Sequence, residues 1–212
     1  MKPKYEFTGK TKVFEGITLH QIKRLSDCYV GGWIESEANL SHEGTCWVWD
    51  NAMVFGHALV SGNAKLFDKA IVRDYAIVTD NVKVCGCGVV KDRAVACGNA
   101  SIGGIVCGSA RVSGKASVGG VVCDTAIVCD EARLWEATVS GNSLIEGKTN
   151  LIRGTQVIDS HINAAFFFSN CQIQTNVVID EAYIKSNSLN DEDPHRRGMQ
   201  FILNKVIGGI DT

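Results

Sequence analysis

From Cys46 to Ser101 the sequence repeats every six residues, and this short period constrains the fold more than any other feature. The successive hexapeptides read CWVWDN, AMVFGH, ALVSGN, AKLFDK, AIVRDY, AIVTDN, VKVCGC, GVVKDR and AVACGN. A six-residue period is too short for a helical repeat and is typical of a parallel β-helix. The chain is therefore expected to be all-β, with each hexapeptide forming one side of a triangular coil.

The repeat also predicts which side chains lie inside the coil. Because side chains alternate along a strand, the central apolar residue and the small residue two positions before it point to the same side, which must be the interior. Three strands form a turn of about eighteen residues, so residues one turn apart stack. Over the whole repeat, about eight turns are expected. The interior positions predicted from this register are Val48, Val54, Val60, Leu66, Val72, Val78, Val84, Val90, Ala96 and Ile102.

After Ile102 the repeat becomes shorter. The segments ASIGGIVCGSARVSGK and ASVGGVVCDTAIVCDE align as consecutive sixteen-residue units, which indicates that one corner has been tightened. In this register Cys107 and Cys123 are expected in the interior. The pattern continues less regularly through Ile162, Phe168, Ile173 and Ile179 to Ile184.

The two ends depart from the repeat, as expected for a stacked array whose core needs terminal caps. Residues 1–45 are predicted to form an N-terminal cap in which KYEFTGKTKVFEG makes two short strands around TGK. Residues 46–184 are predicted to form the coil, and residues 185–212 are predicted to form a linker and a short amphipathic helix. That helix is expected to start at Pro194 and to stop at a glycine pair.

Charge, cysteine content and hydrophobicity indicate which binding partners and which cellular compartment to expect. The net charge of −2 offers no general basic field for nucleic acid or for an anionic membrane. The nine cysteines are odd in number and contain no CxxC pair, which favours free thiols in a reducing compartment. No apolar stretch reaches the length of about 18 residues that a membrane helix requires. A cytoplasmic protein without a membrane segment is therefore expected.

One corner of the coil is predicted to carry a polar, cationic edge. His57, Tyr75 and Arg93 are spaced by one turn, and Arg73 and Lys91 lie beside them. Guanidinium and ammonium groups are suited to binding phosphate or carboxylate. The alternative is a solvated edge with ion pairs to Asp74 and Asp92. A different corner carries Asn63, Asn81 and Asn99, which are expected to form a structural ladder because asparagine tolerates left-handed backbone angles.

Apolar side chains are also expected on the outside of the coil. Trp47, Trp49 and Phe67 lie on one face and are predicted to form a subunit interface, with a ligand platform as the alternative. Further apolar columns are expected on the other two faces, and a single coil would expose too much of them. Coverage by other subunits is favoured over coverage by the caps. These columns contain Met53, Ile71 and Val89, and Leu59, Ile77 and Val95.

The repeat resembles the left-handed β-helix superfamily, which includes acyltransferases and γ-class carbonic anhydrases, usually as homotrimers. The resemblance implies left-handed coiling, although parallel crossovers are otherwise right-handed. It also implies a homo-oligomer, with a trimer favoured. Residues 31–52, GGWIESEANLSHEGTCWVWDNA, are similar to bacterial and phage hexapeptide-repeat proteins that are often labelled acyltransferases. This similarity implies a bacterial or phage origin.

The resemblance implies two kinds of catalytic site. A zinc site of the carbonic anhydrase kind needs three histidines gathered from adjacent turns, and His57 has no second histidine one turn away, so no metal site is expected. Acyltransferases of the superfamily use a histidine base and an acyl-CoA donor. The candidates for that base are His57 and His161.

Three functions remain open. The favoured hypothesis is a non-catalytic oligomeric binding protein that sequesters a small anionic, nucleotide-like ligand or blocks a host defence protein, without a cofactor. The second is an acyltransferase that uses an acyl-CoA donor, with His57 or His161 as the base. The third is a structural spacer or virion component.

Overall fold

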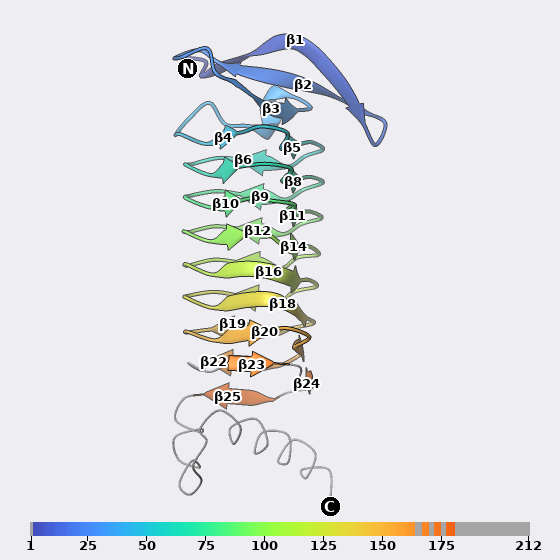
Figure 1. Cartoon of the computed structure of the whole chain (residues 1–212), viewed down its shortest axis with the longest axis vertical. Coiled ribbons are helices and arrows are strands. Elements are labelled where there is room, and N and C mark those ends of the chain that lie inside the picture. Colours follow the sequence, from blue (N-terminus) through green and yellow to red (C-terminus); the bar gives the residue numbers. More distant parts are fainter. Residues whose placement is uncertain (1, 164–166, 170–171, 175–176, 181–212) are drawn as a thin grey trace, which may run out of the picture.

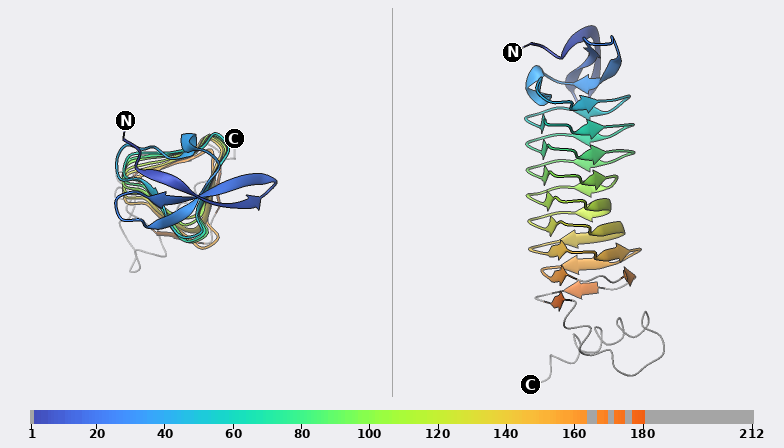
Figure 2. Two further views of the ribbon diagram at one scale, coloured as in Figure 1. Left: turned by 90° about the horizontal axis from the view of Figure 1, so that it is seen from above. Right: turned by 90° about the vertical axis from the view of Figure 1, so that its left-hand side faces the viewer.

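The computed structural model describes residues 2–163, 167–169, 172–174 and 177–180. These residues form one long stack of coils, each built from short β-strands (Figure 1). Seen from above, the stack has a triangular outline, and the N-terminal strands lie across its end (Figure 2). The chain is therefore an all-β solenoid of about eight turns, as the repeat predicts. The predicted C-terminal helix lies outside the described residues. Within them, no helix combines the length and the apolar character needed to span a membrane.

Each side of the triangle is a parallel sheet. The strands of the first face are β4 (Trp47–Val48), β7 (Lys65–Leu66), β10 (Lys83–Val84), β13 (Ser101–Ile102), β16 (Ser117–Val122), β18 (Arg133–Ser140), β20 (Asn150–Ile152) and β23 (Phe167–Ser169). The strands of the second face are β3 (Val30–Ile34), β5 (Met53–Val54), β8 (Ile71–Val72), β11 (Val89–Val90), β14 (Ile105–Val106), the second halves of β16 and β18, β21 (Gln156–Ile158) and β24 (Gln172–Gln174). The strands of the third face are β6 (Leu59–Val60), β9 (Ile77–Val78), β12 (Val95–Ala96), β15 (Arg111–Val112), β17 (Ile127–Val128), β19 (Leu144–Glu146), β22 (His161–Asn163) and β25 (Val178–Asp180).

The interior predicted from Val48 to Ile102 is confirmed. Every one of the ten predicted side chains is fully buried, and so are the alanines two positions before them. Each turn contributes one residue to each interior column, since Val48 pairs with Leu66 and Leu66 pairs with Val84. Apolar residues of similar type therefore stack along the axis and form one continuous core.

The prediction that Cys107 and Cys123 lie inside is wrong. The interior positions are Val106 and Val122, and both thiols lie on the outside. The physical reason is a tighter corner than expected, because Gly104 lies directly against the backbone of Gly120 in the next turn. This close contact removes two residues from the corner, and β16 runs through it without a break.

The asparagine ladder is confirmed, but its backbone role is different. The Nδ2 of Asn63 donates to the Oδ1 of Asn81 at 3.1 Å, and the Nδ2 of Asn81 donates to the Oδ1 of Asn99 at 2.9 Å. The left-handed residues are those immediately before them, for which φ is 63° at Gly62 and 57° at Asp80. The asparagines thus bind adjacent turns together through their side chains, while glycine and aspartate make the corner.

The N-terminal segment differs from the predicted pair of short strands around TGK. β1 (Tyr5–Phe14) runs through TGK as one strand with a bulge, and it pairs antiparallel with β2 (Ile17–Arg24). The turn lies at Glu15 and Gly16, both of which have positive φ. This hairpin packs on the second face, where Phe14 contacts Phe55 with ring centroids 5.9 Å apart.

Parallel stacking begins upstream of Cys46, the predicted start of the coil. β3 pairs with β5, and Leu40 forms a parallel bridge with Val60. Between them, the short 3-10 helix η1 (Glu37–Asn39) ends in the buried Asn39, whose Nδ2 donates to the carbonyl oxygens of Gly56 and Ala58, both at 3.0 Å. The division into domains stays a prediction, but cap and coil share one core.

Candidate functional site

The predicted cationic residues lie along the corner where the second face turns into the third. Arg73 and Lys91 are the outward residues that follow the inward Val72 and Val90 of β8 and β11. His57, Tyr75 and Arg93 follow two residues further on, and all three are exposed. We call these five residues the corner edge. The structure brings them together on one corner over three consecutive turns, as the spacing predicted.

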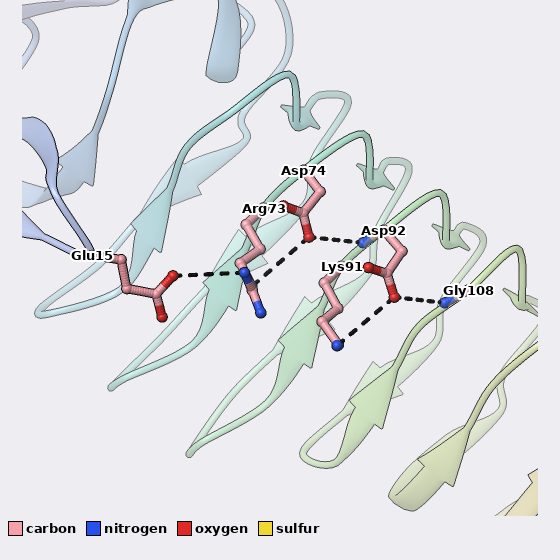
Figure 3. Close-up of polar contacts among 6 residues, drawn as sticks. All are labelled: Glu15, Arg73, Asp74, Lys91, Asp92 and Gly108. Atoms are coloured by element: carbon pink, nitrogen blue, oxygen red, sulfur yellow. Dashed lines mark hydrogen bonds and ion pairs between the residues drawn. The ribbon is translucent and has the colours of Figure 1, made fainter.

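Carboxylates hold this corner in shape. The Oδ2 of Asp74 accepts a hydrogen bond from the backbone N–H of Asp92 at 3.1 Å. The Oδ2 of Asp92 accepts from the N–H of Gly108 at 3.0 Å, so each turn is pinned to the next (Figure 3). Asp74 and Asp92 have positive φ, where a short side chain that can bond nearby backbone is favoured.

The cations of the corner edge pair only loosely with these carboxylates. The Nε of Arg73 lies 3.9 Å from Asp74, and the Nζ of Lys91 lies 3.8 Å from Asp92. On its other side Arg73 reaches Glu15 of the hairpin at 3.6 Å (Figure 3). Charge-assisted hydrogen bonds are about 2.7–2.9 Å long, so these contacts neutralise charge without using the N–H donors fully. The solvated edge with ion pairs to Asp74 and Asp92, the alternative interpretation, is therefore part of the arrangement.

An aromatic pair completes the corner edge. The rings of His57 and Tyr75 stack with centroids 4.7 Å apart and an interplanar angle of 22°. Tyr75 remains 58% exposed, so the outer side of the pair is open to solvent. A flat ring can stack there while an anionic group reaches the neighbouring cations.

Two thiols continue the outward column of Arg73 and Lys91. Cys107 and Cys123 follow in the next two turns. Burial raises the pKa of Cys107, although Lys91 opposes the shift. Burial and then Asp124 raise the pKa of Cys123 to about 11.

The raised pKa predicts slow alkylation of Cys123 at neutral pH. Because the thiolate is the nucleophile and the pKa lies near 11, its labelling rate by iodoacetamide should rise about tenfold per pH unit between pH 7 and pH 10. Peptide mass spectrometry after timed labelling measures this rate. A rate that levels off below pH 9 would contradict the assignment.

The predicted aromatic interface needs a correction at Trp47. Trp47 is only 1% exposed because the N-terminal segment covers it, so it cannot present its ring to another subunit. The guanidinium of Arg24 lies over the rings of Trp47 and Trp49, at 5.1 and 5.4 Å from their centroids. Trp49 stacks on Phe67 at 6.0 Å, and both are partly exposed. The role of Trp49 and Phe67 in an interface stays a prediction.

The outward apolar columns of the second and third faces differ in their exposure to solvent. On the second face the hairpin covers Met53, so a cap supplies part of the coverage that was expected from subunits. On the third face Leu59 and Ile77 remain 37% and 40% exposed. This column is therefore left partly exposed to solvent in the single chain.

Of the two candidate bases, His161 has a carboxylate partner. Its Nε2 lies 2.8 Å from the Oε1 of Glu146, and the Nδ2 of Asn163 donates to the same oxygen at 3.0 Å. A carboxylate in this position orients the imidazole. Sequence reasoning missed Glu146 and Glu15, because their partners lie one turn or a whole hairpin away. The change of turn length after Ile102 could have placed Glu146 beside His161.

Comparison with known proteins gives a partial match. No family model matches the chain. A segment of 69 residues is 39% identical to the uncharacterized acetyltransferase YdcK of Escherichia coli K12, and it covers 29% of this chain. By its six-residue repeat and its three stacked parallel faces, the chain is a hexapeptide-repeat β-helix protein. The match spans 20% of the relative's own length, so for this hexapeptide-repeat protein the relative's named activity is a hypothesis to be tested.

Proposed function

We propose that this hexapeptide-repeat protein is a non-catalytic, homo-oligomeric binding protein that holds a small anionic ligand with a flat ring at the corner edge. The observation that carries the proposal is the stacked, exposed His57–Tyr75 pair beside Arg73 and Lys91, whose N–H donors are not fully used. A nucleotide-like molecule combines the two required groups. Its ring would stack on the aromatic pair, and its phosphate would displace the loose ion pairs.

The third face supports an oligomer. Its exposed column of Leu59 and Ile77 would be buried between subunits, and a trimer is the state favoured by the family resemblance. The phage origin and the role against a host defence stay predictions.

Titration calorimetry at low salt tests the binding proposal, with AMP, a cyclic dinucleotide, acetyl-CoA and inorganic phosphate as probes. Arg73→Ala and Lys91→Ala should each weaken binding about tenfold, because each removes a charge-assisted hydrogen bond. Glu15→Gln should strengthen binding, since it releases Arg73 from its competing carboxylate. Lys83→Ala, an exposed lysine on the first face, is the matched control and should leave affinity unchanged.

Two outcomes would overturn the proposal. One is that none of the probes binds. The other is that a probe binds equally well to the wild type and to the Arg73→Ala, Lys91→Ala double variant, which would place its site elsewhere.

The second candidate is acyl transfer with His161 as the base. It is favoured by the contact of His161 with Glu146 and by the name of the relative. Release of free CoA from acetyl-CoA in the presence of amine or hydroxyl acceptors measures this activity. Turnover that is lost in His161→Ala and kept in His57→Ala would replace the binding proposal.

A further inference from the structure

Three possible metal ligands gather on the third face, away from the corner edge. They are Cys129 and Asp130, which follow β17, and Glu146 of β19 in the next turn. The Sγ of Cys129 and one carboxylate oxygen each of Asp130 and Glu146 all lie within 4.8 Å of one another. The stacking of Val128 on Ile145 brings them together, because it places Cys129 directly beside Glu146.

A fourth ligand lies one turn further along the stack. The Nε2 of His161 is 2.8 Å from the Oε1 of Glu146, and its side chain is 38% exposed. The group therefore offers one sulfur, one nitrogen and two carboxylates from three consecutive turns.

The backbone and a neighbouring amide hold the carboxylates in place. The Oδ2 of Asp130 accepts from the N–H of Gly147 at 3.1 Å, which anchors the carboxylate beside the thiol. Glu146 is held by the Nδ2 of Asn163. Fixing ligands through such supporting contacts lowers the entropy that metal binding must overcome.

We propose that Cys129, Asp130, Glu146 and His161 form a binding site for one divalent transition-metal ion of the zinc or cobalt type. A mixture of thiolate, imidazole and carboxylate suits these ions, whereas Mg²⁺ prefers an all-oxygen shell. Bonds to Zn²⁺ are about 2.0–2.3 Å long, so the ligand atoms must close to about 3.5 Å from one another. The ligand atoms of Cys129, Asp130 and Glu146 already lie within 4.8 Å of one another. His161 contacts Glu146 and would turn from that contact toward the ion.

The bound ion would clamp three turns of the solenoid together. This inference does not depend on the binding proposal for the corner edge, since the two groups share no residue. It differs from the acyl-transfer alternative in one respect: metal-free protein keeps His161 available as a base, and metal-bound protein does not.

Titration of the chelator-treated full chain with Co²⁺ tests the site. We expect one equivalent to bind, with thiolate-to-cobalt charge-transfer absorption in the near ultraviolet and a raised melting temperature. Zn²⁺ should displace the cobalt, and excess Mg²⁺ should not.

The fold supplies a matched control for the thiol. Cys97 occupies the same outward column as Cys129, two turns away, because Ala96, Val112 and Val128 stack in register. Cys129→Ser should abolish the charge-transfer band, and His161→Gln should weaken cobalt binding at least tenfold, while Cys97→Ser behaves like the wild type. Absence of cobalt binding, or a band that survives in Cys129→Ser, would overturn the proposal.

Discussion

Replacing Gly104 with alanine is expected to destabilise the solenoid by about 3 kcal/mol, at the upper end of what overpacking costs. A Cβ at this position would collide with the backbone carbonyl of Gly120 in the next turn. Neither partner is a flexible side chain, so relief requires the two turns to move apart. That movement would break the hydrogen bonds that join β14 to β16.

The neighbouring glycine supplies the control for this prediction. A Cβ at Gly103 would meet nothing within 4 Å, so Gly103→Ala should change stability little. Urea unfolding followed by circular dichroism compares the two variants with the wild type. Equal stability of Gly103→Ala and Gly104→Ala would show that the corner is not packed as described.

The second large effect is expected at Asn39, where the cap joins the coil. Asn39→Ala removes the donor that serves the carbonyl oxygens of Gly56 and Ala58. Asn39 itself is completely buried, and a buried group left without a partner costs about 1–3 kcal/mol. The bond to Ala58 is buried, so its carbonyl is left unpaired and the variant should lose about 1–3 kcal/mol of stability, with a smaller loss from the part-buried bond to Gly56.

Another asparagine provides the comparison for Asn39. Asn63 also hydrogen-bonds to an adjacent turn, but it is exposed, so water can replace the lost bond in Asn63→Ala. We expect a loss of about 1 kcal/mol or less there. Hydrogen exchange should show faster opening of the first coil turns in Asn39→Ala, and an exchange pattern identical to that of Asn63→Ala would contradict the role of Asn39 as a buried link.

The strictly periodic part of the fold could be predicted from sequence because every strand of the repeat places the same kinds of residue inside and outside the coil. Alternation alone placed Val48 to Ile102 inside and the corner edge outside, and the structure agrees. The Asn63 to Asn99 ladder followed from its spacing in the same way. Handedness could not be derived from this pattern, because inward and outward alternation is the same for both hands.

The predictions that failed depend on contacts between segments far apart in sequence. The position of Cys107 depends on how closely Gly104 approaches Gly120, and a count of residues per turn does not reveal which corner shortens. Trp47 has the same alternation as an exposed residue, and only the folding of the N-terminal segment over it buries the ring. The pairing of Glu15 with Arg73 likewise requires the hairpin to lie on the second face.

The corner edge can be tested most directly through the C2 proton resonance of His57, observed by NMR during titration with the tightest-binding anionic probe. His57 lies within the corner edge, whereas His20, His42 and His161 lie on other parts of the chain, and His57→Gln assigns the signal. We expect a saturable shift of the His57 resonance that is lost in the Arg73→Ala, Lys91→Ala double variant. Saturating ligand that leaves the His57 resonance unchanged, or shifts it equally in the double variant, would contradict a binding site at this corner.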